Sequence, residues 1–201
     1  MKDWFQVEML DDTTYVISEH KHYEKTNCYL LLGKQRALLI DSGLGVADIR
    51  KITDQLTALP VTVIATHVHW DHIGSHGSYI DVLVHEREYS WLNGEFPLPL
   101  GVVKQQLMKE PCSFPGDFHL DAYTVWQGNA GIVRDGDILD LGVVISVSCI
   151  HRGILLDICA FLIWNGNGCT AGILSIKVFC TVIIRPLIHR HICCRYKGCK
   201  S

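Results

Sequence analysis

A run of histidines and an aspartate directly after a short β-branched segment constrains this chain more than any other feature. Residues 61–65 (VTVIA) predict a buried strand, and residues 66–77 follow it without a break. Five of those twelve residues can bind a metal ion or a proton: His67, His69, Asp71, His72 and His76. A chance surface loop rarely gathers such residues at the end of a buried strand, so we predict a metal site here.

The spacing within this segment predicts two groups of ligands. His67 and His69 point the same way in an extended segment, because side chains repeat every second residue, and together they can bind one ion. Asp71 and His72 follow where the chain turns, and they can reach a second ion. Two ions held about 3.5–4 Å apart can share a hydroxide and polarise a carbonyl or phosphoryl group.

The string THVHWDHIGSHG resembles the H-x-H-x-D-H signature of the metallo-β-lactamase fold. The order of the neighbouring segments is also similar: IDSGLG after a strand, then a helix, then the VIATH strand. This resemblance covers residues 1–147 and implies an α/β fold, an αββα sandwich of two sheets between helices with the metals at one edge. It also implies a zinc-dependent hydrolase with two Zn2+ ions, other divalent metals being possible, whose bridging hydroxide attacks an ester, thioester, lactone or phosphodiester.

The resemblance assigns roles to individual positions. His67 and His69 would bind the first metal, Asp71 and His72 the second, and Asp71 would also orient the nucleophilic water. Asp41 matches an acid that lies beneath the loop and holds the ligands in place, although an Asp before Ser-Gly can also simply form a turn. His76 and His85 can face the substrate or be ordinary polar residues. Flavin-linked diiron relatives carry Glu where His69 stands, which disfavours an oxidoreductase.

The rest of this region reads as alternating strands and helices. We predict strands at 15–17, 27–32, 37–40, 61–65, 81–84 and 138–147, helices at 46–59 and 85–92, and a turn at 135–137. The segment 92–118 contains Pro97, Pro99 and Pro111, so we expect a loop there that borders the substrate pocket.

The amino-acid composition limits the classes of protein to which this chain can belong. Hydrophobic residues make up 48% of the 201-residue chain and charged residues 19%, which is typical of one globular domain. The formal net charge of -3 disfavours nucleic acid and membrane partners. The family resemblance implies a small-molecule substrate. The first residues, MKDWFQVEML, do not resemble a signal peptide, and no apolar run predicts a membrane span, so a cytoplasmic location is expected. The oligomeric state stays open.

The composition changes near residue 147. Seven of the nine cysteines lie in residues 148–201, where Asp157 is the only acid against seven Lys and Arg residues. The family's later T-P-G-H and G-D segments, which complete its metal sites, are absent in their expected form. We therefore divide the chain into a metallo-β-lactamase-like part, 1–147, and an aberrant Cys- and Ile-rich tail, 148–201, to which we assign no secondary structure.

A shifted reading frame accounts for this tail. Codons compatible with Ser148 to Cys159, read one base out of phase, permit LHTPGHSPGHM, and Gly168 to Ile173 permit LYSGD in the same frame. Both missing motifs return in order, so we interpret the tail as out-of-frame translation. The alternatives are a genuine Cys-rich zinc tail and a membrane-seeking tail.

The consequence for function is an incomplete site. Two protein ligands per ion bind zinc weakly, so we expect low activity for the chain as written, a truncated or inactive copy of the enzyme. The missing second half of the sandwich would leave one sheet with an uncovered apolar face, so we also expect poor solubility. The alternative is a non-catalytic metal-binding or interaction protein that uses a genuine Cys-rich tail.

Overall fold

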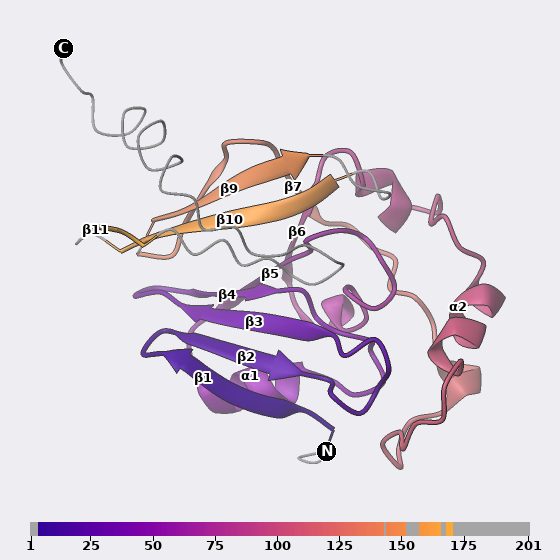
Figure 1. Cartoon of the computed structure of the whole chain (residues 1–201). Helices are drawn as coiled ribbons and strands as arrows, with labels where there is room; N and C mark the ends of the chain where they lie inside the picture. The colour runs from indigo at the N-terminus through magenta and orange to yellow at the C-terminus, as the bar shows by residue number, and fades with distance from the viewer. Residues whose placement is uncertain (1–3, 143, 152–156, 166–167, 171–201) are drawn as a thin grey trace.

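Seven strands form the larger of two sheets in the computed structural model, which describes residues 4–142, 144–151, 157–165 and 168–170 (Figure 1). The strands lie side by side in chain order: β1 (Gln6–Asp11), β2 (Thr14–Ser18), β3 (Asn27–Leu32), β4 (Ala37–Ile40), β5 (Val61–Ile64), β6 (Asp81–His85) and β7 (Gly131–Val133). Strands β1 to β4 are antiparallel, whereas β4 to β7 run parallel. The carboxyl ends of β4 and β5 therefore meet at one edge of the sheet, where the histidine-rich segment begins.

The second sheet is antiparallel and has the order β11-β10-β9-β8. Its strands are β8 (Ile138–Asp140), β9 (Val144–His151), β10 (Asp157–Asn165) and β11 (Gly168–Thr170). Strand β9 pairs with β10 from Val144↔Trp164 to His151↔Asp157, so β9 runs straight across residue 147, where the composition changes. The tail to which we assigned no structure thus contributes to a sheet as far as Thr170; our predictions for residues 171–201 fall outside the described residues.

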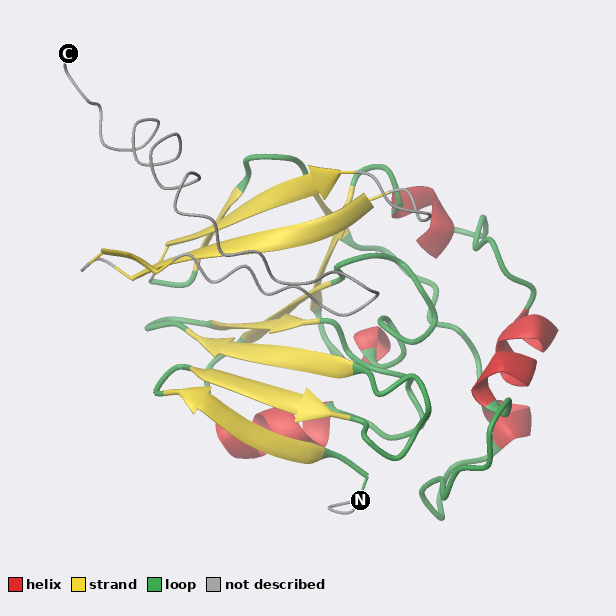
Figure 2. Cartoon of the chain, viewed as in Figure 1, coloured by secondary structure: helices red, strands yellow, loops and turns green. Residues whose placement is uncertain are grey.

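Helices are few in the described part of the chain. The α-helices are α1 (Arg50–Leu56) and α2 (Leu100–Leu107), and short 3-10 turns occur at His76–Ser78, Tyr89–Leu92 and Leu120–Ala122. Helix α1 lies against the larger sheet, and α2 stands to one side of both sheets (Figure 2). No helix within the described ranges has the length and apolar character needed to span a bilayer.

Both faces of the larger sheet are buried, because successive side chains along its central strands point in turn into two different apolar clusters. Leu39 and Val63 point into the cluster that includes Ile49 and Ile52 at and near α1. Their neighbours Leu38 and Ile64 point the other way, into a cluster shared with Leu141 beside the smaller sheet. The two-sheet arrangement with a helix outside the larger sheet confirms the expected α/β sandwich. In Figure 2, α1 lies on the side of the larger sheet and α2 stands apart from the smaller sheet.

Two predicted helices are shorter or absent. We predicted a helix over 46–59, but α1 begins only at Arg50, whose backbone N–H donates to Asp48 Oδ1 at 3.0 Å. The preceding residues form a loop, because Gly45 has a φ of +74° and its backbone packs against Gly74. The helix predicted over 85–92 was also wrong: His85 ends β6, and only a 3-10 turn follows.

Two loop and strand boundaries were wrong as well. The segment 92–118 contains α2, which Pro99 precedes as the N-terminal flanking residue. The single strand predicted over 138–147 is two strands, β8 and β9, because Gly142 adopts a φ of +80° between them. The turn at 135–137 is confirmed, with Gly136 at a φ of +85°.

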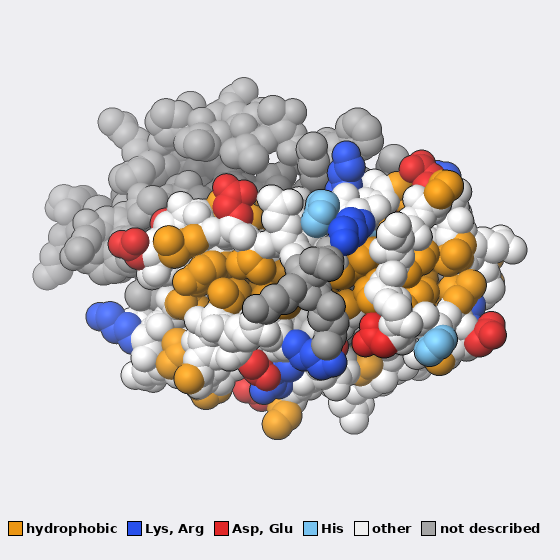
Figure 3. Space-filling model, turned by 90° about the horizontal axis from the view of Figure 1, so that it is seen from below, with side chains coloured by type: hydrophobic (Ala, Val, Ile, Leu, Met, Phe, Trp, Pro, Cys, Tyr) orange, Lys and Arg blue, Asp and Glu red, His pale blue; other side chains and the backbone are white. Residues whose placement is uncertain are grey.

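Charged side chains are dispersed on the face shown in Figure 3. Lys and Arg alternate there with Asp and Glu, and neither sign forms a continuous patch on that face. This distribution agrees with the small net charge and offers no basic surface for a nucleic acid on this side.

Candidate functional site

The histidine-rich segment lies at the edge of the larger sheet because β4 and β5 run parallel and end together, with Ile40 opposite Ile64. Asp41 follows β4 and Thr66 follows β5 after a single residue. The Asp41 backbone N–H donates to Ile64 O at 2.9 Å, and the Thr66 N–H donates to Asp41 Oδ1 at 2.7 Å. The two chain segments that leave these strands are thus joined where the predicted site lies.

The predicted ligands gather because the loop turns tightly after β5. The His69 N–H donates to His67 O and the His72 N–H to His69 O, both at 3.0 Å. The imidazole of His67 lies 4.1 Å from that of His72 and 5.3 Å from that of His69, measured between ring centroids. Asp71 Oδ2 lies 3.3 Å from His72 Nε2, and Asp71 Oδ1 lies 3.5 Å from His69 Nδ1. All four side chains therefore face one small region.

Asp41 lies beneath this region and holds both sides of it. Its carboxylate accepts hydrogen bonds from the Thr66 hydroxyl and lies 2.7 Å from His72 Nδ1 through Oδ2. Asp41 is fully buried and has a φ of +60°, which a residue other than glycine adopts only where its surroundings enforce it. Because Nδ1 of His72 is bonded to Asp41, Nε2 is the nitrogen that faces Asp71.

The charges of this cluster are strongly coupled. Burial lowers the pKa of His72, but the negative charges of Asp41 and Asp71 outweigh burial and raise that pKa well above its ordinary value. Burial raises the pKa of Asp71, but the charge of His72 and the contacts with His69 hold it well below its usual range. His72 and Asp71 thus form a buried ion pair when no metal is bound.

His67 is neutral and offers an unused nitrogen. Burial, assisted by the charge of His72, lowers the pKa of His67 to about 3. Its Nδ1 lies 3.1 Å from the Thr66 hydroxyl oxygen, whereas its buried Nε2 has no hydrogen-bond partner; neither does the buried Oδ1 of Asp71. Buried polar atoms without partners are uncommon in folded proteins and often mark a missing ion or water.

These atoms fit a metal ion as a partial ligand set. Neutral imidazole nitrogen and carboxylate oxygen are the donors that zinc prefers, and two of them are left without a hydrogen bond. Among the described residues, no three His, Cys, Asp or Glu side chains are already arranged to hold one ion. Within the described residues, the histidine-rich loop therefore supplies only part of a ligand set.

Several buried polar residues that the sequence did not single out support the loop. Ser42 Oγ lies 2.6 Å from His76 Nδ1 and accepts a hydrogen bond from the Ser75 N–H. Glu88 accepts a hydrogen bond from the Val68 N–H at 2.8 Å, and Glu19 binds the loop after β4. In the sequence, Ser42, Glu88 and Glu19 are isolated polar residues next to turns, so no spacing pattern predicts that they are buried beside the loop.

We considered His76 and His85 as substrate-facing or ordinary polar loop residues. Both are buried, His76 fully and His85 at the end of β6. Burial and the charge of His72 lower the pKa of His76 to about 3, so its ring is neutral, and it packs 5.6 Å from the indole of Trp126. This position makes His76 a support for the loop and removes it from any exposed substrate surface.

Helix α2 is tied to the loop through the residues after β2. His22 Nε2 lies 3.0 Å from Leu107 O, and Tyr23 donates its hydroxyl to Gln106 O at 2.8 Å. The His22 ring also packs edge-on against Trp70 of the histidine-rich loop, at 6.3 Å between centroids. The segment that we expected to border the substrate pocket therefore contacts the loop through His22.

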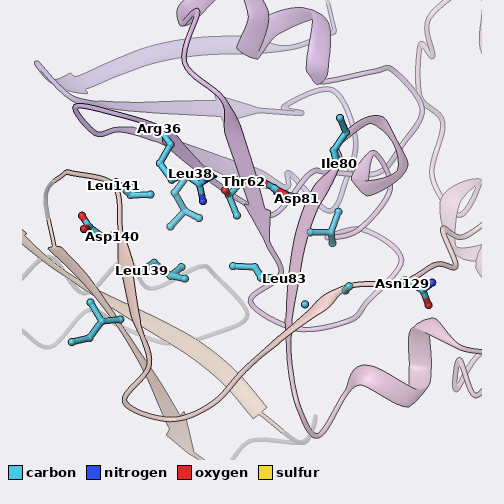
Figure 4. A pocket seen from close by; sticks show the side chains of 14 residues that line it. Arg36, Leu38, Thr62, Ile80, Asp81, Leu83, Asn129, Leu139, Asp140 and Leu141 are labelled. Carbon is cyan, nitrogen blue, oxygen red and sulfur yellow. Dashed lines mark ion pairs between the residues drawn. The ribbon is translucent and has the colours of Figure 1, made fainter.

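A hollow among the described residues lies away from the histidine-rich loop. A space of about 730 Å³ opens between the two sheets, beside Leu38, Leu83 and Leu139 (Figure 4). Its rim includes Arg36 and Asp81, which form an ion pair at 3.6 Å. Arg36 precedes β4 and Asp81 begins β6, so this hollow lies at the amino ends of the parallel strands, whereas the histidine-rich loop lies at their carboxyl ends. We do not assign the chemistry to it.

Comparisons with known proteins agree with this geometry. A sequence profile of the Metallo-beta-lactamase superfamily matches residues 24–144. The chain is 35% identical over 101 residues to the acyl-coenzyme A thioesterase MBLAC2 of Gallus gallus, covering 43% of this chain and 35% of that protein. It is 26% identical over 161 residues to the protein of the same name from Bos taurus, covering 70% of this chain and 55% of that one. The chain thus spans between about a third and about half of the length of these relatives.

A solved structure with the same arrangement is a metallo-beta-lactamase from Pontibacter korlensis. It superposes with a TM-score of 0.55 over 79% of this chain and 66% of that one, at 14% sequence identity. Identity at this level shows a shared fold and carries no information about substrate.

Proposed function

The chain belongs to the metallo-beta-lactamase superfamily, and on that premise we propose that it is part of a metal-dependent hydrolase that cleaves a small-molecule thioester. The observation that carries this proposal is the cluster of His67, His69, Asp71 and His72 at the carboxyl end of β5, with His72 fixed from below by Asp41. Two atoms of this cluster, His67 Nε2 and Asp71 Oδ1, are buried without a hydrogen bond.

We assign the ligands as the two groups suggested by their spacing. His67 and His69 would hold one Zn2+ ion, and Asp71 and His72 a second. Bound divalent ions supply a hydroxide nucleophile at neutral pH and polarise the substrate carbonyl. The superfamily membership supports a metal-dependent hydrolase in general; the choice of zinc is our inference from the donor types.

The chain's own residues prepare this chemistry. His67 is neutral at physiological pH, so the lone pair of its Nε2 is available to an ion. Asp41 holds Nδ1 of His72, which directs Nε2 toward the site. Asp71 keeps its carboxylate ionised, and its free Oδ1 can accept a hydrogen bond from an attacking water and orient it.

A thioester is the favoured substrate class. The relatives from chicken and cattle are named acyl-coenzyme A thioesterases, and the cattle protein aligns with 70% of this chain. Esters, lactones and phosphodiesters present similar electrophiles and remain the comparison substrates. We also propose a cytoplasmic location, where thiols stay reduced; among the described residues, Cys28 and Cys112 are free thiols.

Metal titration combined with a thioesterase assay tests the proposal. We expect weak Zn2+ or Co2+ binding that His67→Ala and Asp71→Ala each reduce and that the double substitution abolishes, together with slow release of coenzyme A thiol from an acyl-coenzyme A that requires both residues. His119→Ala, a substitution in the segment after α2, is the matched control and should change neither. Metal binding that survives both loop substitutions would refute the assignment.

The same experiment distinguishes the proposed hydrolase from the alternative, a non-catalytic protein with a genuine Cys-rich tail. In that case metal binding would depend on the cysteines from Cys149 onward and thiol release would not occur. The incomplete ligand set predicts weak binding by the loop alone, because zinc sites usually have at least three protein ligands.

A further inference from the structure

A buried carboxylate that takes no part in the ligand cluster lies at the end of β2. Glu19 has 1% of its surface exposed. Its Oε1 accepts a hydrogen bond from the indole Nε1 of Trp4, and its Oε2 accepts one from the backbone N–H of Leu44, both at 2.8 Å. Charged groups are seldom fully buried unless they have a specific partner or task.

The carboxylate lies directly against the loop that follows β4. A Cβ atom added to Gly43 would stand 2.4 Å from Glu19 Oε2, closer than atoms can approach. Gly43 also has a φ of +75°, which favours glycine. The backbone of Gly43 and Leu44 is therefore shaped around the Glu19 side chain.

This loop is in turn bonded to the histidine-rich loop through backbone atoms. The Ser42 N–H donates to His72 O at 2.7 Å, and the Gly74 N–H donates to Gly43 O at 2.8 Å. Asp41, which binds the His72 imidazole, directly precedes Ser42. A chain of contacts thus leads from Glu19 through the loop after β4 to His72.

We propose that Glu19 is a positioning residue of the metal site: it holds the loop of residues 42–45, and that loop holds His72 and the segment around it. The proposal rests on the function proposed above, because the residue it positions is a proposed ligand. Glu19 touches neither substrate nor metal in this scheme and acts through Leu44 and Gly43.

The two bonds call for a carboxyl group and not only for a side chain of this size. Both donors are N–H groups, one on each oxygen, and a carboxyl group, unlike an amide, presents an acceptor oxygen to each of them. Glutamine would place an amide NH2 against either the Trp4 indole or the Leu44 amide, so one buried donor would lose its acceptor.

The test compares Glu19→Gln with the unchanged 201-residue chain by two measurements. The first is Co2+ affinity, followed by its visible absorption; the second is hydrogen exchange at the amides of Ser42 and Gly74. We expect Glu19→Gln to weaken Co2+ binding about tenfold and to speed exchange at both amides by a similar factor. Ser18→Ala is the control: it removes the 2.6 Å hydrogen bond to Asn27 from the residue directly before Glu19, the last of β2, and should do neither.

The outcomes separate this proposal from the proposed function. If the unchanged chain binds no Co2+, the proposed function fails, and the amide exchange alone decides whether Glu19 positions the loop. If Glu19→Gln leaves both the affinity and the exchange unchanged, the positioning role is overturned. Should Glu19→Gln not fold, Trp4→Phe replaces it in the same measurements. This substitution removes one of the two hydrogen bonds to Glu19 and keeps an aromatic ring against Phe114. Faster exchange at the Gly74 amide then supports the proposal, and unchanged exchange overturns it.

Discussion

Asp41 and His72, separated by 31 positions in the chain, share a buried contact of 2.7 Å between Oδ2 and Nδ1. Neither side chain has appreciable solvent exposure, and Asp41 also accepts hydrogen bonds from the backbone and hydroxyl of Thr66. Asp41 therefore joins the end of β4 to the segment after β5 and sets the direction of the His72 ring before any ligand arrives.

We expect Asp41→Asn to weaken both folding and metal binding. Asparagine tolerates the positive φ of this position, so the backbone can stay, but the charge that faces His72 is lost. Removing one partner of a buried pair costs about 3–5 kcal/mol, and loss of such a supporting contact typically lowers metal affinity about 10–100-fold. Urea unfolding without metal and calorimetric zinc titration measure the two effects.

Asp54→Asn is the matched control for this substitution. Asp54 pairs with Arg50 at 2.7 Å on the exposed face of α1. Such surface pairs contribute roughly 0–1 kcal/mol, so the control should leave zinc affinity unchanged. Equal effects of the two substitutions would contradict a special role for Asp41.

Gly74→Ala should displace the histidine-rich loop. A Cβ at Gly74 would lie 2.2 Å from Gly45 N and 2.3 Å from Leu44 C, both backbone atoms that no side-chain rotation can move away. We expect a loss of stability on the order of 1–3 kcal/mol, typical of overpacking, together with weaker metal binding. Gly116→Ala, where nothing lies within 4 Å of the added atom, should be nearly neutral in thermal unfolding. A fully stable Gly74→Ala chain would show that the two loops are not in contact as described.

The buried Glu19 should make the metal-free chain less stable as pH rises. Burial raises the pKa of Glu19 from 4.5 to about 7, against the hydrogen bonds from Trp4 and Leu44; Asp71 raises it further and His72 lowers it. Between these two values the unfolded chain has released the proton that the folded chain retains, so the free energy of unfolding falls with rising pH. The stabilisation is complete below about pH 4.5 and is lost as pH passes about 7.

Glu19→Gln isolates this contribution, because glutamine does not titrate. Urea unfolding of both chains at pH 5 and pH 7.5 should show that the unchanged chain loses on the order of 1–3 kcal/mol more than Glu19→Gln over this interval. Parallel pH profiles of the two chains would rule out a raised pKa for Glu19.

The reading-frame hypothesis predicts what a continued frame would restore. We propose that a chain with residues 1–147 unchanged, followed by the alternative-frame translation that contains HTPGH and GD, binds about two equivalents of zinc. The 201-residue chain should bind zinc more weakly, because its tail lacks those motifs. Sequencing of the DNA across codons 140–201 gives the direct answer: an intact frame as printed would discard this hypothesis and favour a genuine Cys-rich tail.

Local patterns of apolar and turn residues were sufficient to predict the bounds of some strands. The boundaries of β3 and β4 match the prediction because each is a short apolar run bounded by turn residues. The helix predicted over 46–59 was too long because the close approach of Gly45 to Gly74 holds its first residues in a loop, and no local pattern reports that contact. Helix α2 was missed because Pro99 and Gly101 indicate a loop when read locally, although proline is well suited to the start of a helix.

The sequence by itself determined the superfamily and the strands at 27–32 and 37–40, and it carried the prediction of the metal-binding residues, since residue type and spacing are local properties. Only the tertiary structure decided how those donors are supported. It brought Asp41 beneath His72, buried His76 against Ser42 and placed Glu19 on the loop after β4. The physical reason is that these contacts join residues about 25 to 34 positions apart, and burial alone makes their charges and hydrogen bonds strong.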